Sequence, residues 1–209
     1  STDFNIKRLR LIESHIGGSV LKNNLARAVA FEELMKMENH KNHEKFLQQF
    51  ILINNSKSYL TEVLDLHNEI EDMSAGKILP ELKLQNHQLK IVSTKDLIDQ
   101  PTVFYFWSQT QMSHYRNTIL KAKKLEKQFP KYKFKGVCLQ PFNEIVFEVY
   151  RMMDIDPQTQ LAFIDFDKDS KKWVLSLLNR SIVVDANGRI IEGFGNFSAP
   201  GFEDLLREN

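Results

Sequence analysis

Apolar positions in the first third of the chain recur at spacings of three and four residues, a pattern typical of amphipathic helices. Polar or glycine-containing segments separate the stretches that show this pattern. They predict helices over residues 19–37, 44–53 and 59–73. Ser19 follows a Gly-Gly pair and is suited to cap the first helix, because its side chain can accept a backbone hydrogen bond. We therefore expect residues 1–76 to form a helical segment.

The pattern changes after the Ser-Ala-Gly-Lys sequence at 74–77, where short apolar runs and alternating positions favour strands. Strands are expected in a hairpin at 82–92, at 103–107, at 132–139, and in a second hairpin at 181–192 with an Asn-Gly turn. Helices are expected between them at 95–98, 111–128 and 143–153, after the acidic loop 165–169 through Leu178, and at 202–207. This order predicts an α/β domain over residues 77–209, with a mixed sheet flanked by helices.

Charge and hydropathy exclude two classes of partner. The chain carries 28 basic and 27 acidic residues, a formal net charge of +1, so it lacks the basic surplus that nucleic acid or an anionic membrane would attract. The longest apolar runs, such as 102–107, are far shorter than a bilayer span. We therefore expect no nucleic-acid partner and no membrane span in this chain. The chain begins Ser-Thr-Asp, and we count an upstream domain outside this sequence among the expected partners.

A single cysteine, Cys138, limits thiol chemistry. It can form no disulfide within the chain and no zinc site made of cysteines. Because Val137 and Leu139 flank it in an expected interior strand, we interpret it as a small buried hydrophobic residue. A peroxidase that uses one cysteine is the alternative.

Five stretches carry a resemblance to a known family. They are the entry segment Ile78-Leu-Pro-Glu-Leu82, Lys90–Ile98, the Phe-Trp strand Val103–Trp107, Lys133–Leu139 and the hairpin Ile182–Ile190. In this order they resemble the thioredoxin fold, and in particular the bacterial envelope thiol–disulfide oxidoreductases related to alkyl hydroperoxide reductases. The resemblance covers about residues 77–209. It implies a thioredoxin-like fold and a location in the cell envelope or periplasm.

The chain departs from this family where the family's chemistry resides. In the family, Cys-x-x-Cys begins the helix after Phe-Trp, where the helix N-terminus stabilises a thiolate. Counted from Trp107, the two cysteine positions fall on Gln111 and His114; counted back from Arg116, they fall on Met112 and Tyr115. The family's proline before the late strand would fall near Asn179. The resemblance therefore implies a redox-inactive variant, and we assign no catalytic residue and no cofactor.

The altered turn can still form a binding groove. The helix after it offers backbone N–H groups to a carboxylate, a peptide carbonyl or another anion. The candidate groove residues are Trp107, Gln111, Met112, Ser113, His114, Tyr115, Asn179, Arg180 and Ser181. Nucleophilic catalysis at Ser113 would need a base and a group that orients the base. His114 is adjacent, but the sequence supplies no third group.

Two further clusters contain residues that can bind metal ions, but their spacing does not match that of a zinc site or a calcium loop. His40 and His43, with Glu44, lie in an expected polar turn, and no third ligand is indicated; His15, His67 and His87 show no ligand spacing. The acidic loop 165–169 begins like a calcium loop but continues with Ser170 and Ser176, where the EF-hand pattern needs Gly and Glu. We expect a capped polar loop there and no metal site in this chain.

The sequence thus predicts a redox-inactive, thioredoxin-like binding or scaffolding module of the bacterial cell envelope. Its partner would be a peptide, a protein or a small anionic ligand. Two alternatives stay open: an enzyme that uses Cys138 or has an unrelated activity at His114, and a structural domain of a longer chain.

Overall fold

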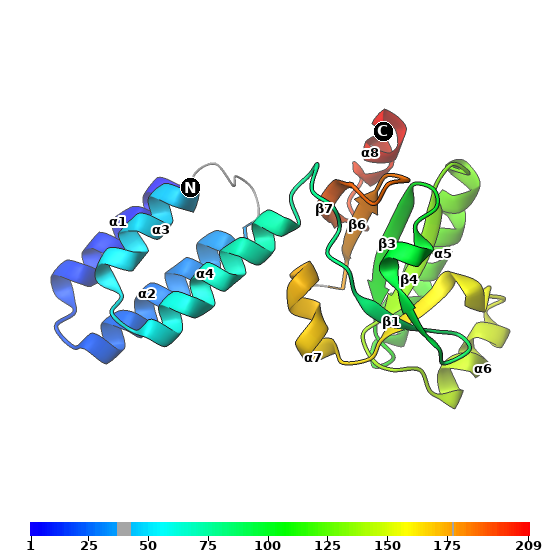
Figure 1. Ribbon diagram of the computed structural model, residues 1–209, viewed down its shortest axis with the longest axis horizontal. Helices are drawn as coiled ribbons and strands as arrows, with labels where there is room; N and C mark the ends of the chain where they lie inside the picture. Colours follow the sequence, from blue (N-terminus) through cyan, green and yellow to red (C-terminus); the bar gives the residue numbers. More distant parts are fainter. Residues whose placement is uncertain (37–42, 177) are drawn as a thin grey trace. The chain divides into compact units, whose positions relative to one another are not determined.

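The computed structural model describes residues 1–36, 43–176 and 178–209. These residues form two compact units, Ser1–Glu71 and Asp72–Asn209, which we call the helical unit and the α/β unit (Figure 1). The sequence predicted a domain boundary after Gly76, whereas the helical unit ends at Glu71. The boundary after Gly76 stays a prediction. In the described part of the chain, we find no helix with the length and apolar character needed to cross a membrane.

The described part of the helical unit consists of the helices α1 (Thr2–His15), α2 (Ser19–Leu34), α3 (His43–Ile53) and α4 (Lys57–Asp72). The last three are at the predicted places, whereas α1 was not predicted. Gly18 is the N-cap of α2 and Ser19 is its first residue, so the expected capping role of Ser19 is wrong. The expected polar break at 39–42 lies outside the described residues.

Buried polar side chains form hydrogen bonds between the helical segments of this unit, in addition to its apolar core. Buried Asn5 on α1 donates from Nδ2 to Oε2 of buried Glu33 on α2, at 2.7 Å. Buried Asn54, after α3, donates from Nδ2 to the carbonyl oxygen of Asn23 on α2, at 3.1 Å. Apolar residues such as Leu9 are fully buried in the same unit. The helices are thus held by burial and by directional hydrogen bonds together.

The α/β unit is built on a mixed seven-stranded sheet with the order β2-β1-β5-β4-β3-β6-β7. Its strands are β1 (Lys83–Asn86), β2 (Ile91–Ser93), β3 (Thr102–Trp107), β4 (Lys133–Cys138), β5 (Gln160–Phe163), β6 (Arg180–Val184) and β7 (Ile190–Asn196). Its α-helices are α5 (Met112–Gln128), α6 (Glu144–Met152), α7 (Phe166–Asp169) and α8 (Phe202–Glu208); short 3-10 helices are η2 (Thr94–Leu97), η3 (Pro157–Thr159) and η4 (Ser170–Trp173). The predicted α/β class with a mixed sheet is confirmed.

Two details differ from the sequence prediction. The buried strand β5 was not predicted, and it runs parallel to β4, so that α6 connects two parallel strands. The helical stretch expected through Leu178 ends at Trp173, because Val174 adopts a left-handed backbone conformation with φ of 49°. The expected cap of the acidic loop is present, since the Asp165 side chain accepts a hydrogen bond from the Lys168 N–H.

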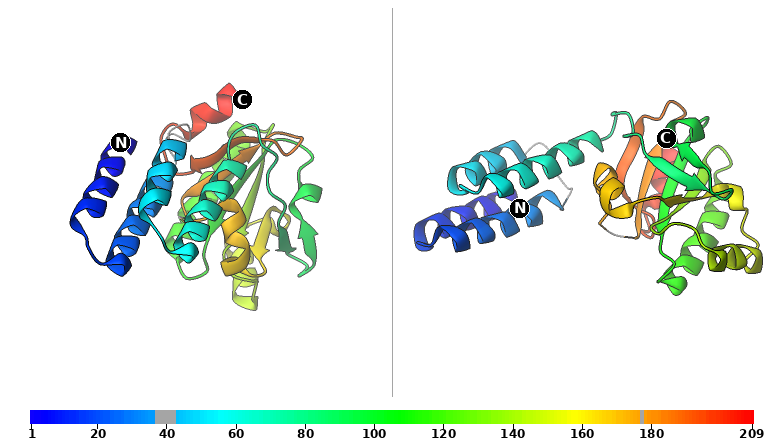
Figure 2. Two further views of the ribbon diagram at one scale, coloured as in Figure 1. Left: turned by 60° about the vertical axis from the view of Figure 1, so that its left-hand side comes forward. Right: turned by 60° about the horizontal axis from the view of Figure 1, so that its bottom comes forward.

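The interior strand β3 is buried along its whole length, and its alternating side chains supply the two faces of the sheet. Figure 2 gives two further views of the sheet and the helices beside it. Val103, Tyr105 and Trp107 belong to the core that also holds buried residues of α5, α6 and α8. Phe104 and Phe106 pack on the other face, where their ring centroids lie 5.3 and 6.1 Å from that of Trp173. This aromatic filling explains why the strand has no polar alternation.

Candidate functional site

The site that the sequence indicates lies where the parallel strands β3 and β4 end. The register of the two strands places Trp107, the last residue of β3, beside Cys138, the last residue of β4. Parallel strands bring the loops that follow them to the same edge of a sheet, which is where open α/β sheets bind ligands. The loop after β3 leads into α5 at Met112, and the loop after β4 leads into α6 at Glu144.

Aromatic rings fill the space behind the altered turn. The rings of Trp107 and Tyr115 stack with centroids 4.0 Å apart, and Tyr150 on α6 meets Trp107 edge-on at 6.2 Å. Burial raises the pKa of the Tyr115 and Tyr150 phenols well above the ordinary range, so both stay neutral at physiological pH. The Nε1–H of Trp107 makes no hydrogen bond within the described residues. These rings therefore supply packing rather than an acid or a base.

Side-chain amides join the two loops at this edge. We call Gln109, Gln140 and Asn143 the amide clamp. Gln109 receives a bond at its Oε1 from Asn143 Nδ2 at 2.6 Å and donates from Nε2 to the Pro141 carbonyl oxygen at 2.8 Å. The Oε1 of Gln140 accepts from the Gln109 backbone N–H at 3.0 Å, and its Nε2 donates to buried Ser108 Oγ at 3.0 Å. The clamp fixes the loop after β3 to the loop after β4.

The only thiol is enclosed by this clamp. Cys138 is fully buried; its Sγ accepts from Gln109 Nε2 at 3.6 Å and donates to Gln140 Oε1 at 3.7 Å. Burial raises the pKa of the thiol to about 11, so the reactive thiolate is scarce near neutral pH. The interpretation of Cys138 as a packing residue agrees with this environment.

An apolar groove adjoins the aromatic rings. A cavity of about 110 Å³ is lined by Trp107, Gln109, Met112, Tyr115, Asn143, Ile145, Val146 and Val149. A second cavity of about 370 Å³ is lined by Met112, Ser113, Arg116, Asn117, Val149, Met152 and Met153. The two share Met112 and Val149, and together we call them the α5–α6 groove. Met112, Ile145 and Met152 leave 44%, 69% and 85% of their surface exposed, so apolar surface lies open to solvent along the groove.

The structure brings together part of the candidate residue set. Trp107, Met112, Ser113 and Tyr115 line the α5–α6 groove. Gln111 is exposed and is the N-cap of α5, with no hydrogen bond from its own side chain to the cap. His114 is partly buried, and burial lowers its pKa. Within the described residues, the Ser113 hydroxyl and the His114 ring share no hydrogen bond, so the geometry does not assemble a nucleophile with its base.

The candidate residues before and within β6 form hydrogen bonds that stabilise the α/β unit. Asn179 donates from Nδ2 to Asn196 Oδ1 at 3.3 Å. Buried Arg180 donates from Nε to the Gly193 carbonyl oxygen at 3.0 Å and also binds the Val174 carbonyl oxygen. Burial lowers the pKa of its guanidinium to about 9, which still leaves it charged at neutral pH.

Ser181 completes this set. It is fully buried and pairs with Tyr105 across the β3–β6 ladder. In the described part of the chain, Asn179, Arg180 and Ser181 are not among the residues that line the α5–α6 groove. All described peptide bonds are trans, so no cis peptide precedes β6 there.

Sequence reasoning missed the α6 side of the groove. Asn143, Ile145, Val146 and Val149 line this side, and Gln109 lines the groove from the loop after β3; none of them was among the candidates. A signal was present, since apolar residues occur on nearly every face of the 143–153 stretch, more than one core-facing stripe needs. Only Val146 and Tyr150 of α6 are fully buried. The remaining apolar residues of this helix were therefore available to form a surface.

The expectation for the histidine pair needs correction. His43 is not in a solvated turn: it is the first residue of α3 and only 2% of its surface is exposed. His40 lies outside the described residues. Among the described residues, His43 forms a group with His67 and Glu71 that could hold a metal ion.

Comparison with known proteins places the fold. No protein-family model and no curated protein matches the chain. Among solved structures, a thioredoxin-like protein from Bacteroides caccae matches with a TM-score of 0.64 and 8% identity, covering 100% of this chain and 78% of that one. A Bacteroides vulgatus chain described as a thiol-disulfide oxidoreductase matches with a TM-score of 0.56 and 11% identity, covering 66% of this chain and 97% of that one.

A further match is the thioredoxin domain of a thiol-disulfide oxidoreductase from Bacteroides vulgatus, with a TM-score of 0.50 and 17% identity, covering 65% of this chain and 94% of that one. These likenesses confirm the thioredoxin-like fold that the resemblance implied. With one cysteine in its sequence, the chain lacks a Cys-x-x-Cys motif.

Proposed function

We propose that this chain is a redox-inactive, thioredoxin-like binding module of the bacterial cell envelope, and that it holds an apolar segment of a peptide or partner protein in the α5–α6 groove. The observation that carries the proposal is the open apolar surface of Met112, Ile145 and Met152 along the two cavities of the groove, at the edge where β3 and β4 end. This is the edge at which the related oxidoreductases keep their dithiol.

The loss of redox activity follows from two features. A dithiol reaction needs a second thiol, and this chain has only Cys138. That thiol is buried, and its raised pKa, about 11, removes the thiolate that would attack a disulfide or a peroxide. The same burial argues against the alternative of a peroxidase that uses one cysteine.

The lining of the groove indicates the chemistry of its ligand. Most lining residues are apolar, and among the described ones Arg116 is the only charged side chain. Apolar cavities of this kind favour protruding aliphatic or aromatic side chains. A cation at the rim favours an acidic group next to them. We therefore expect a segment that joins apolar side chains to an aspartate, a glutamate or a C-terminal carboxylate.

The location in the envelope rests on the resemblance to the bacterial envelope oxidoreductases. Fractionation of cells that carry the full-length protein tests it. Recovery with periplasmic or envelope markers supports the proposal, whereas recovery with cytoplasmic markers contradicts it.

Peptide binding tests the central claim. A library of short peptides is screened against the purified chain, and the affinity of selected peptides is measured for Val149→Glu and Met152→Glu. Each substitution puts a charge into the apolar groove and should weaken binding by about tenfold or more, the equivalent of 1.4 kcal/mol. Leu120→Glu on α5 is the matched control, because Leu120 is exposed and does not line the groove. Equal losses in all three variants would contradict the groove.

Reduction of insulin disulfides tests the redox claim separately. The unaltered chain and Cys138→Ala should both show only the background rate. A rate above background that Cys138→Ala abolishes would show that the thiol is active and would overturn the proposal of a redox-inactive module.

A further inference from the structure

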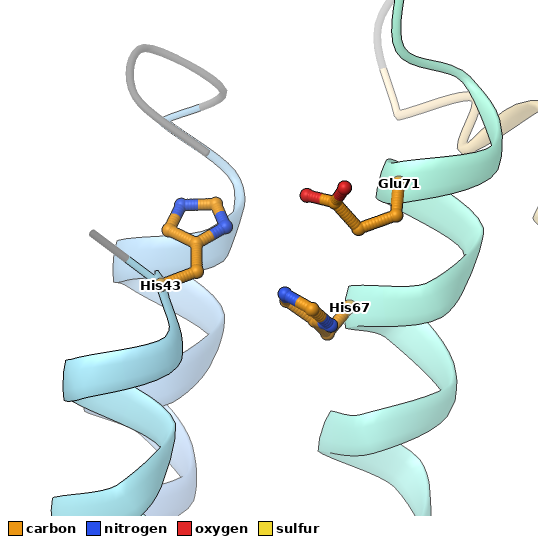
Figure 3. Close-up of side chains that lie close together, drawn as sticks. All are labelled: His43, His67 and Glu71. Carbon is orange, nitrogen blue, oxygen red and sulfur yellow. The ribbon is translucent and has the colours of Figure 1, made fainter. Parts of the chain in front are cut away.

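Three side chains with metal-binding atoms converge inside the helical unit. His43 comes from the start of α3, and His67 and Glu71 come from the last turns of α4. One ligand atom from each lies within 4.8 Å of the others. Figure 3 shows the Glu71 carboxylate extending from α4 toward the His43 ring, with His67 one turn below it on the same face of the helix.

The backbone positions make this convergence a property of the fold. His67 and Glu71 are four residues apart on α4, so they project from the same side of the helix. His43 reaches them from α3, and its ring centroid lies 5.8 Å from that of His67. His43 is buried, whereas His67 and Glu71 are partly exposed. The group is therefore held on one side and open to solvent on the other, which gives an ion a path of entry.

The ligand types select the ion. Two imidazole nitrogens and one carboxylate oxygen form a set that zinc accepts, and a water molecule can take the fourth position. Calcium and magnesium prefer oxygen ligands, so two imidazoles disfavour them. Zinc bonds of about 2.0–2.2 Å at tetrahedral angles put ligand atoms roughly 3.3–3.6 Å apart. In the structure the ligand atoms lie within 4.8 Å of one another, so an ion would have to draw them closer, and His67 and Glu71 are the partly exposed side chains that would move.

We propose that His43, His67 and Glu71 form a zinc site that ties the N-terminus of α3 to the C-terminal turn of α4. Three protein ligands leave one coordination position to water or to an incoming group. Glu71 is the last residue of the helical unit, so the ion secures the end of α4 where this unit gives way to the α/β unit. The site is independent of the α5–α6 groove, which lies in the other unit.

Zinc titration of the full chain tests the proposal. The untagged protein is stripped with a chelator, and zinc is added in competition with a chromophoric chelator. We expect one zinc ion per chain. His67→Gln and Glu71→Gln should each weaken binding by at least the roughly 10–100-fold that the loss of an outer-sphere partner costs. Zinc should also raise the melting temperature of the unaltered chain by more than that of either variant at the same zinc concentration, because stabilisation of the folded state grows with affinity.

Matched controls and a spectroscopic readout separate the site from adventitious binding. His15→Gln and Asp65→Asn alter exposed residues of the same unit and should bind zinc as the unaltered chain does. Cobalt at the site should give the intense visible bands of a four-coordinate ion. Circular dichroism without metal verifies that the variants fold, and His67 and Glu71 are used because buried His43 is harder to replace. Zinc binding that is absent, or equal in His67→Gln, Glu71→Gln and the controls, would overturn the proposal.

Discussion

The helical unit and the α/β unit fill their interiors with different kinds of contact. Between its helices the helical unit places hydrogen-bonded polar pairs, such as Asn5 with Glu33 at 2.7 Å. At the strand ends of the α/β unit, aromatic rings occupy the interior, as in the stack of Trp107 on Tyr115 at 4.0 Å. The buried thiol of the α/β unit, Cys138, is enclosed by the side-chain amides of Gln109 and Gln140.

This difference shows two ways of specifying a structure. Hydrogen bonds between buried groups are directional, and a shifted helix would leave a donor or acceptor without its partner, at a cost in free energy. Packing without directional bonds tolerates the exchange of one hydrophobic side chain for another of similar volume. A thioredoxin-like unit can therefore lose its dithiol and keep its fold. Four measurements test this comparison.

The largest expected effect is on the aromatic cluster. Trp107→Ala should lower the free energy of unfolding of the α/β unit by about 3–5 kcal/mol, because it leaves a cavity behind a fully packed ring. Denaturant unfolding measures this through the fluorescence of Trp173, since both tryptophans belong to the α/β unit. Leu120→Ala, at an exposed position of the same unit, is the control and should change stability by less than about 0.5 kcal/mol. A loss below about 1 kcal/mol for Trp107→Ala, the size of a surface effect, would refute the packing role.

The second effect is on the reactivity of Cys138. Its pKa of about 11 exceeds the usual 9.0, so the thiolate fraction at pH 8 is about 100-fold lower than for an ordinary thiol. Alkylation of the native chain should be at least that much slower than alkylation of the unfolded chain. Its rate should keep rising with pH beyond 9 instead of levelling there. Rapid labelling at pH 7, with a plateau near or below 9, would contradict an enclosed thiol.

The third effect concerns the polar pair of the helical unit. Asn5→Ala removes the donor to the buried Glu33 carboxylate and should cost about 1–3 kcal/mol of unfolding free energy. Replacing both residues by Leu should recover most of that loss, because no buried group is then left unsatisfied. Far-UV circular dichroism follows the helical unit, and tryptophan fluorescence should not change. A double variant less stable than Asn5→Ala would show that the pair contributes more than its desolvation costs.

The smallest effect is a dependence on pH. Burial alone would raise the pKa of the Glu33 carboxyl, but hydrogen bonds from Thr2, Asn5 and Lys36 outweigh it and hold the pKa below the usual 4.5. A lowered carboxyl pKa stabilises the folded state above pH 4.5, and that contribution is lost as the pH falls further. Acid unfolding of the helical unit should therefore be less steep in Glu33→Gln. Identical acid profiles would contradict the assignment.

Local patterns were sufficient for most of the fold. The spacing of apolar residues located α2, α3, α4 and α5. The turn before β7 was predictable because Asn-Gly favours a turn with positive φ, and Gly188 has a φ of 75° there. Helix α1 was missed because exposed apolar residues obscure its helical periodicity. Phe4 and Leu11 are residue types typical of a core, yet they are 59% and 58% exposed. Strand β5 was missed because Gln160-Leu-Ala-Phe163 is only four residues long and β4 and β1 determine its place.

The candidate site was less predictable, because it depends on contacts between distant segments. Trp107 and Met112 are placed by local structure, but Val149 reaches the groove only because α6 packs beside α5. The histidine group shows the same limit. The four-residue spacing of His67 and Glu71 was readable in the sequence, whereas the approach of His43 depends on how α3 and α4 pack.

The amide clamp has a consequence for the kinetics of binding. Its bonds from Gln109 and Gln140 join the loops that precede α5 and α6, so the walls of the groove are set before a ligand arrives. Association then needs no slow opening step, and its rate should lie in the ordinary range for docking of preformed surfaces, about 10⁵–10⁷ M⁻¹ s⁻¹. Ligands that differ in affinity should accordingly differ in how long they stay bound, and hardly in how fast they bind.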